Sequence, residues 1–179
     1  MVGVELVTPA AIAGLACPYC GRAMPRDADG MRAAQSAWGL CGASANANGH
    51  LIGLLLLAPS ELHGRAAARI TSAWVAPQHC GNGVGRALLR TVAGGLAKAR
   101  ITLLLAGAKT RPNCSAPPAG FLAGTGFVAQ PGGSLWALDL GTTVRVFKPS
   151  VLDRLGRLVQ SVGPLAPPEP AHNQAEPLR

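Results

Sequence analysis

The chain has 179 residues, about the length of one domain, and 49% of them are hydrophobic, enough for a sizeable core. Only 13% are charged, about half of the usual share, which excludes a disordered chain. The longest aliphatic stretch, Leu54–Ala58, is far shorter than the ~20 residues of a membrane span. No basic segment followed by an apolar run stands at the N-terminus. We therefore predict no signal peptide, no membrane span and a cytoplasmic location.

The net charge is +8, and its distribution is uneven. No acidic residue lies between Glu61 and Asp139, so the middle of the chain carries the excess of Lys and Arg. Such a segment favours an anionic partner, either a phosphorylated cofactor, a nucleic acid or a membrane surface, although a solvated basic face is an open alternative. Nucleic acid is the weakest of these, because the three Trp, one Tyr and three Phe do not alternate with the basic residues. We predict no nucleic-acid partner.

The first half of the chain is predicted to alternate between strands and short helical pieces. Val2–Val7 alternates like an edge strand, and Thr8 with Pro9 is typical of a helix start before Ala10–Ala16. A polar loop is expected over 25–30. Three strands are then predicted, the first two of them joined by a turn at 46–49: Trp38–Ala45, His50–Ala58 and Ala67–Val75.

The second half contains the strongest helix prediction, Val84–Ala97, whose apolar residues recur at helical spacing. A buried strand (Ile101–Leu105), a Pro-rich loop (Arg111–Pro118) and a short helical piece around Phe121 follow. The remaining expected elements are strands at Leu135–Leu140 and Thr142–Phe147, an amphipathic helix within 148–163, and a disordered Pro-rich tail at 164–179. The helix at 148–163 would pack on the domain or on a second subunit, which leaves a homodimer open.

A glycine-rich turn between a strand and the best helix is the most informative segment. It reads Cys80-Gly81-Asn82-Gly83-Val84-Gly85, with Arg86 directly after it. The first N–H groups of a helix lack intrahelical partners, and glycine lets an anion approach the backbone closely. The segment therefore predicts an anion site. A nucleotide P-loop is excluded because no Lys follows the glycines, and a dinucleotide fold because no acid follows before Asp139.

This segment resembles the cofactor motif of the GNAT superfamily of acyl-CoA-dependent N-acyltransferases, in which Val-x-Pro precedes Arg/Gln-x-x-Gly-x-Gly/Ala. Here Val75 and Pro77 precede it, and Cys80 stands in place of Arg or Gln. Asn113 and the run Phe121–Phe127 resemble the family's downstream Asn and Gly-Phe segment. The resemblance covers roughly residues 2–147 and implies a GNAT-like α/β fold, a mixed and mostly antiparallel twisted sheet flanked by helices.

The resemblance also implies acetyl-CoA as co-substrate, with acetyl transferred directly in a ternary complex to a small-molecule or protein primary amine. The residues implied in cofactor binding include the glycine segment, Arg86 and flanking positions: Val75, Cys80, Gly81, Asn82, Gly83, Val84, Gly85, Arg86, Leu104 and Asn113.

Both side chains that serve the chemistry in many relatives are missing here. The strand before the glycine segment has no Glu, and Leu122 stands where a Tyr is usual. The weak candidates for catalysis are His63, Ser72, Cys114 and Tyr19. An enzyme that relies on water and positioning is one interpretation. A non-catalytic acyl-CoA-binding or interaction module is the alternative.

A third interpretation concerns Cys17-Pro18-Tyr19-Cys20, whose spacing suits a zinc knuckle and resembles the redox motif of glutaredoxins. No second pair at this spacing exists, and Cys41 with His50 would complete a zinc site only by an unusual arrangement. An odd number of cysteines, five in all, also argues against a disulfide framework. We therefore predict thiols and no metal, with a zinc or thiol-redox protein as the remaining alternative.

Overall fold

The computed structural model describes residues 2–17, 20–25, 27–108 and 114–142. Contacts divide the chain into two compact units, Met1–Phe147 and Lys148–Arg179, and the described residues all belong to the first. The helix expected within 148–163, the tail at 164–179 and positions 143–147 of the last expected strand lie outside the described residues. Across the described ranges, no helix combines the length and apolar character needed to cross a membrane.

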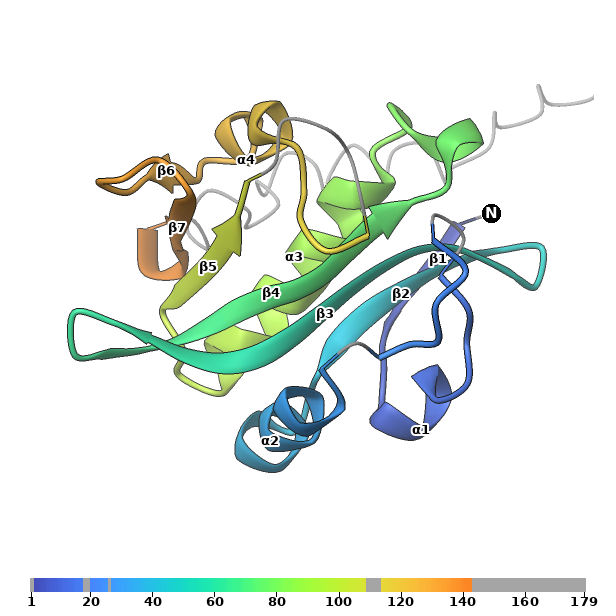
Figure 1. Ribbon diagram of the computed structural model, residues 1–179, viewed down its shortest axis with the longest axis horizontal. Helices are drawn as coiled ribbons and strands as arrows, with labels where there is room; N and C mark the ends of the chain where they lie inside the picture. The colour runs from blue at the N-terminus through green and yellow to red at the C-terminus, as the bar shows by residue number, and fades with distance from the viewer. Residues whose placement is uncertain (1, 18–19, 26, 109–113, 143–179) are drawn as a thin grey trace, which may run out of the picture. The chain divides into compact units, whose positions relative to one another are not determined.

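Seven strands of the described residues form one sheet in the order β1-β2-β3-β4-β5-β7-β6, shown in Figure 1. Every neighbouring pair is antiparallel except β4 and β5, which are parallel. The strands are β1 Val2–Leu6, β2 Gly42–Ala47, β3 His50–Leu62, β4 Arg65–Val75, β5 Leu103–Gly107, β6 Val128–Ala129 and β7 Leu135–Asp139. This mixed, mostly antiparallel sheet with flanking helices confirms the predicted fold class.

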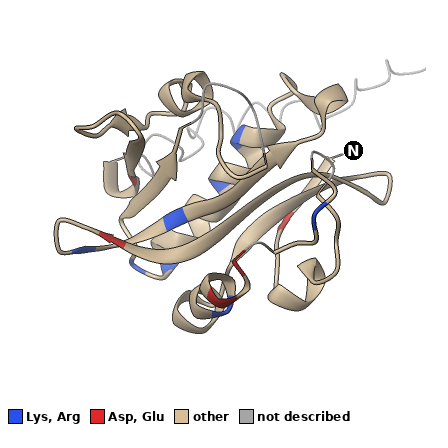
Figure 2. Cartoon of the chain, viewed as in Figure 1, with Lys and Arg blue, Asp and Glu red and all other residues tan. Residues whose placement is uncertain are grey.

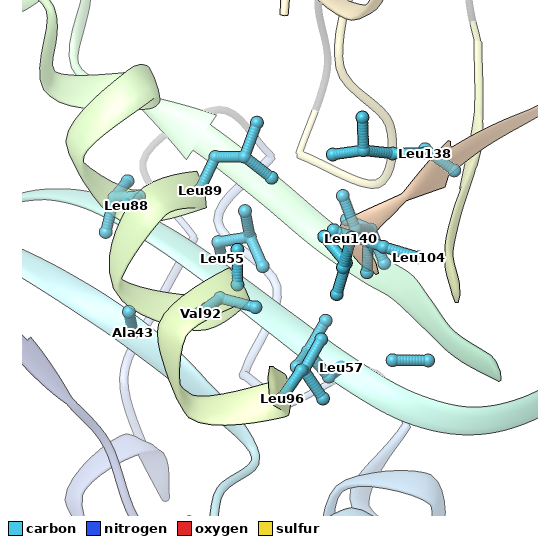
Figure 3. Packing of buried hydrophobic residues seen from close by; sticks show 14 of the residues in the cluster. Ala43, Leu55, Leu57, Leu88, Leu89, Val92, Leu96, Leu104, Leu138 and Leu140 are labelled. Atoms are coloured by element: carbon cyan, nitrogen blue, oxygen red, sulfur yellow. The ribbon is translucent and has the colours of Figure 1, made fainter. Parts of the chain in front are cut away.

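One helix, α3 (Val84–Lys98), covers one face of the sheet (Figure 1). Its buried residues recur every three or four positions, so a single apolar stripe faces the strands. Figure 3 shows Leu88, Val92 and Leu96 of this stripe turned toward Leu55 and Leu57 of β3. This main core contains most of the large apolar side chains and anchors the start of α3.

The opposite face carries a second core beneath α1 (Pro9–Ile12) and α2 (Ala28–Trp38). Leu54 and Leu56 of β3 face this side, while Leu55 and Leu57 face α3, as strand alternation requires. The described residues also include two short elements, the 3₁₀ helix η1 (Pro77–His79) and α4 (Ala119–Gly124).

A β-bulge in β4 changes which side chains face each core. Leu56 of β3 pairs with Ser72, whereas the next residue, Leu57, pairs with Ile70, so Thr71 is the extra residue. Because side chains alternate along a strand, the extra residue reverses the facing of everything after it. Ala73 and Val75 consequently pack against the main core, and Trp74 packs in the second.

Four sequence predictions are wrong in detail. The helix expected over Ala10–Ala16 ends at Ile12, and Ala16 forms a β-bridge with Ala23. Trp38 is the last residue of α2 rather than the start of a strand, and β2 begins only at Gly42. The loop expected at 25–30 contains the start of this helix, where Asp27 caps it by accepting a hydrogen bond from Gly30 N at 2.8 Å. Thr142 belongs to a helical turn rather than a strand, because Asp139 Oδ1 accepts from the backbone N–H groups that follow β7.

Candidate functional site

A cavity of about 590 Å³ lies at the C-terminal end of β4. Pairing between β4 and β5 is limited to Ala68 with Leu104 and Arg69 with Leu105, so the two strands separate beyond this point. The segment that leads to α4 approaches β4 instead, and Ala73 N donates to Cys114 O at 3.2 Å. The cavity is lined by the ends of β3 and β4, the glycine segment, the first turns of α3 and the segment before α4: Leu54, Leu55, Ala73, Trp74, Val75, His79, Cys80, Gly81, Gly83, Val84, Gly85, Arg86, Leu88, Pro117, Pro118 and Phe121.

Gly83 occupies the N-cap of α3, and the N-terminus of this helix lies at the cavity. Its φ of 78° is left-handed, which glycine adopts without steric cost, and no side chain caps the helix at this position. The first intrahelical bond runs from Ala87 N to Gly83 O, so the preceding N–H groups lie outside the ladder. A Cβ built on Gly83 meets no atom within 4 Å. Open space in front of helix N–H groups outside the ladder is the geometry that binds a phosphate.

Gly85 has a different role, which is packing. A Cβ at this position would lie 3.0 Å from Cε2 of Phe121, so glycine lets the Phe121 ring lie directly against the first turn of α3. Phe121 thereby forms a wall of the cavity beside the helix N-terminus. Arg86, the next residue, is exposed, and its guanidinium lies 3.4 Å from Gly124 O of α4.

The electrostatics of this region favour an anion. The first turn of α3 contains no acidic residue, and the helix dipole adds positive potential at its N-terminus. Figure 2 shows Lys and Arg on α3 and β4, whereas Asp and Glu lie elsewhere on the chain. Of the described residues that line the cavity, none is a carboxylate, and Arg86 is the one Lys or Arg side chain.

The structure brings together most of the residues predicted to bind the cofactor. Val75, Cys80, Gly81, Gly83, Val84, Gly85 and Arg86 all line the cavity. Asn82 is exposed in the same turn, outside the lining. Leu104 is fully buried in the main core, so its side chain packs against α3 and β7 rather than reaching a ligand. Asn113 lies outside the described residues.

The catalytic candidates do not converge on one point. His63 lies in the β3–β4 turn and lines a separate hollow of about 260 Å³. The length of β4 separates His63 from the glycine segment, and at about 3.3 Å per residue the two lie roughly 30 Å apart. Ser72 is 1% exposed and pairs with Leu56 just before the cavity. Cys114 is buried beside Ala73, and Tyr19 lies outside the described residues.

Sequence reasoning missed the walls of the cavity that come from elsewhere in the chain. Trp74 of β4 packs in the second core and also lines the cavity. The lining also includes Leu54 of β3, which faces the same side of the sheet as Trp74, and the Pro117-Pro118 pair before α4. The proline pair is the one sequence signal that could have predicted part of this lining, because consecutive prolines mark a stiff loop end where a helix begins.

The comparisons with known proteins agree with this geometry. The family model for the acetyltransferase (GNAT) family matches residues 15–116. The chain therefore belongs to the acetyltransferase (GNAT) family, as the glycine segment predicted. A search of curated protein sequences found no match.

Solved structures share the fold at low sequence identity. The yncA protein of Salmonella typhimurium, solved with its cofactor acetyl-CoA, is 18% identical, with a TM-score of 0.55 over 78% of this chain and 94% of that one. The NatC complex bound to Gag peptide and CoA gives 13% identity and a TM-score of 0.55, over 77% and 98%. A mutant of the toxin AtaT, bound to the C-terminus of the antitoxin AtaR, gives 13% and 0.57, over 84% and 99%.

Proposed function

We propose that this protein is an N-acetyltransferase that moves the acetyl group of acetyl-CoA to a primary amine by direct transfer in a ternary complex. The observation that carries the proposal is the cavity of about 590 Å³ that joins the N-terminus of α3 to the separated end of β4. Family membership, together with relatives solved with acetyl-CoA or CoA, supports acetyl-CoA as the co-substrate.

The cofactor would enter with its pyrophosphate at the glycine segment. Backbone N–H groups from Gly81 to Gly85 would hold the phosphate oxygens, with Arg86 adding charge at the mouth. The pantetheine arm would then run along β4 past Val75, between the strand and Phe121. Apolar lining suits the arm, because it carries few polar groups that need a partner. Asn113 stays a predicted contact at the thioester end.

The chemistry needs one bond exchange and one proton transfer. The neutral amine attacks the thioester carbonyl carbon, the new C–N bond forms, and the C–S bond breaks to release the CoA thiolate. The proton lost by the amine nitrogen reaches this sulfur directly or through water. No carboxylate lines the described cavity, so positioning of the amine against the thioester would supply most of the acceleration, and the acceptor would be an amine of low pKa.

The test is a calorimetric titration with acetyl-CoA, with CoA and ATP as controls, followed by measurement of CoA release with a panel of amines. The proposal expects saturable binding of acetyl-CoA that is much tighter than that of ATP, and steady CoA release with at least one amine. Absence of binding near millimolar acetyl-CoA would contradict the cofactor assignment.

A second candidate is a non-catalytic acyl-CoA-binding module, favoured by the absence of a carboxylate among the described lining residues. This candidate expects the same titration result but no amine-dependent CoA release across the panel. The two functions therefore separate at the second measurement, and absence of acetyl-CoA binding in the first would contradict both.

A further inference from the structure

Three cysteine thiols from distant parts of the chain gather beside the end of β4. Cys17 and Cys20 lie between α1 and α2, and Cys114 follows β5. The three Sγ atoms all lie within 4.8 Å of one another, and those of Cys20 and Cys114 are 3.6 Å apart. Cys17 and Cys114 are buried while Cys20 is exposed. We call these three residues the thiol cluster.

The backbone holds the thiol cluster in place from both sides. Around the first two cysteines the chain forms a tight reversal: Gly21 N donates to Cys17 O at 2.8 Å, and Cys17 N donates to Arg22 O at 2.9 Å. A β-bridge between Ala16 and Ala23 closes this reversal. On the other side, Ala73 N of β4 fixes Cys114 through its carbonyl. These hydrogen bonds preorganise three sulfur ligands, which lowers the cost of binding an ion.

The separations of the sulfur atoms fit a metal ion better than a disulfide. A disulfide requires about 2.05 Å between sulfurs. Tetrahedral Zn²⁺ with Zn–S bonds of about 2.3 Å places its sulfur ligands roughly 3.8 Å apart. The Cys20–Cys114 separation of 3.6 Å, a hydrogen bond between the two thiols, is close to this value, and the other two pairs lie within 4.8 Å. Three thiolates exclude hard ions such as Mg²⁺ and Ca²⁺, which take oxygen ligands.

We propose that the thiol cluster is a Zn²⁺ site with three thiolate ligands and a fourth position for water or another exogenous ligand. Within the described ranges, the group of metal-binding side chains contains these three residues alone. The exposed Cys20 provides the entry path for the ion, and the buried pair limits access to the sulfurs behind it. Binding would displace the thiol protons and leave the ion with one exchangeable coordination position.

Its location gives the ion a structural consequence for the neighbouring cavity. Cys17 and Cys114 belong to the second core together with Leu54 and Trp74, and both of these line the cavity. The ion would tie the segment between α1 and α2 to the segment before α4, across the end of β4. Zinc binding depends on neither acetyl-CoA nor turnover, so this proposal and the acetyltransferase proposal can fail separately.

The experiment uses the full-length protein, reduced, freed of metal and kept without oxygen. Zinc is titrated against a chromophoric chelator, and Co²⁺ is added separately as a spectroscopic probe. The variants are Cys17→Ser, Cys20→Ser and Cys114→Ser, with Cys80→Ser as the matched control, because Cys80 is a thiol outside the cluster. Circular dichroism of each metal-free variant verifies the fold.

The proposal expects one zinc per chain, with tetrahedral Co²⁺ bands in the visible and sulfur-to-cobalt charge transfer in the near ultraviolet. Each cluster variant should bind zinc at least ~100-fold more weakly, since loss of a ligand costs more than loss of an outer-shell partner. Cys80→Ser should bind like the wild type. The wild-type Co²⁺ spectrum decides even where a variant does not fold.

Three results would overturn the proposal. The first is the absence of stoichiometric zinc or of the thiolate–Co²⁺ signature in the wild type. The second is wild-type zinc affinity in a folded Cys114→Ser variant, which would leave only the two cysteines of the local turn. The third is a cluster that forms a Cys20–Cys114 disulfide in air and binds no zinc when reduced.

Discussion

The two ends of β4 differ in what lies beside them, and the difference separates stability from binding. Near its start, β4 lies between β3 and β5, with Ala68 fully buried and Arg65 within 3.8 Å of Asp139 on β7. Beyond Arg69 the β5 partner is gone, and a cavity, the glycine segment and the thiol cluster lie around the end of the strand. We call these regions the paired end and the open end.

The comparison teaches that a cavity forms where this sheet gives up a strand partner. At the paired end, β4 pairs with a strand on each side, and its side chains Ala67 and Ala68 are buried. At the open end, the bulge at Thr71 turns Trp74 toward the second core and Ala73 and Val75 toward the main core, and side chains from both faces of the strand line the cavity. The following predictions test this division, from the largest expected effect to the smallest.

Leu104→Ala should destabilise the paired end strongly and leave binding intact. Leu104 is fully buried in the main core, and truncation of such a leucine costs about 3 kcal/mol of the free energy of unfolding. Denaturant titration measures this loss. Val128→Ala is the control, because Val128 is 65% exposed and its truncation should cost less than about 0.5 kcal/mol. A folded Leu104→Ala protein with weakened acetyl-CoA binding would contradict the division.

Gly83→Asp should have the opposite pattern, with a large loss of binding and a loss of stability smaller than that of Leu104→Ala, about 1 kcal/mol from the left-handed φ of 78°. A carboxylate in the open space at the N-cap would repel a phosphate by about 2 kcal/mol, a roughly thirtyfold loss of acetyl-CoA affinity. Gly83→Asn is the matched control, since it has the same size and tolerance of positive φ without the charge. Calorimetry should find the asparagine variant several-fold tighter than the aspartate variant. Equal affinity of the two would remove the anion site.

The ionisation of Cys41 tests how well the interior away from the cavity is shielded from water. Burial raises the pKa of this thiol from its ordinary value near 9.0 to about 11, partly offset by a backbone hydrogen bond. Since the unfolded thiol ionises first, stability due to this group is complete below pH 9 and falls as the pH rises toward 11. By pH 10 the wild type should lose about 1.4 kcal/mol more than Cys41→Ser, relative to about pH 8. Denaturant titrations in reducing buffer measure this difference, and parallel curves would contradict it.

Arg86→Ala should give the smallest effect. The side chain is exposed at the mouth of the cavity, so its attraction for a phosphate is worth about 1 kcal/mol at low salt, a roughly fivefold change in acetyl-CoA affinity. The effect should shrink as salt is added, because exposed charges are screened. Arg90→Ala, one helical turn further from the cavity, is the comparison and should change affinity less.

Local patterns predicted the elements around the cavity well. The apolar stripe of α3, the strand before the glycine segment and the buried strand after the helix are all present, within a few residues of the expected bounds. These features depend on neighbours in the sequence, such as the repeat of Leu88, Val92 and Leu96 on one helix face. The glycine segment could be recognised for the same reason, because its conformation depends on consecutive residues of the backbone.

The helix α2 was missed although its signals are local. Asp27 and Gly39 stand at its two ends as an N-cap and a left-handed C-cap. Its amphipathic pattern is as pronounced as that of α3, with Met31, Ala34 and Trp38 toward the second core, but the helix is less apolar overall because its other residues are small or polar. The start of the segment was therefore predicted as a polar loop, and Trp38 was assigned to the strand that follows.

The sequence by itself determined the family, the order of most strands around α3 and the glycine segment at the start of this helix, since each depends on residues adjacent along the chain. Only the tertiary structure decided which side chains complete the cavity and which cysteine joins Cys17 and Cys20. Cys114 is 94 residues beyond Cys20, and the two meet because β4 separates from β5 and admits the segment before α4. No local pattern specifies such a meeting, because it depends on where strand pairing stops.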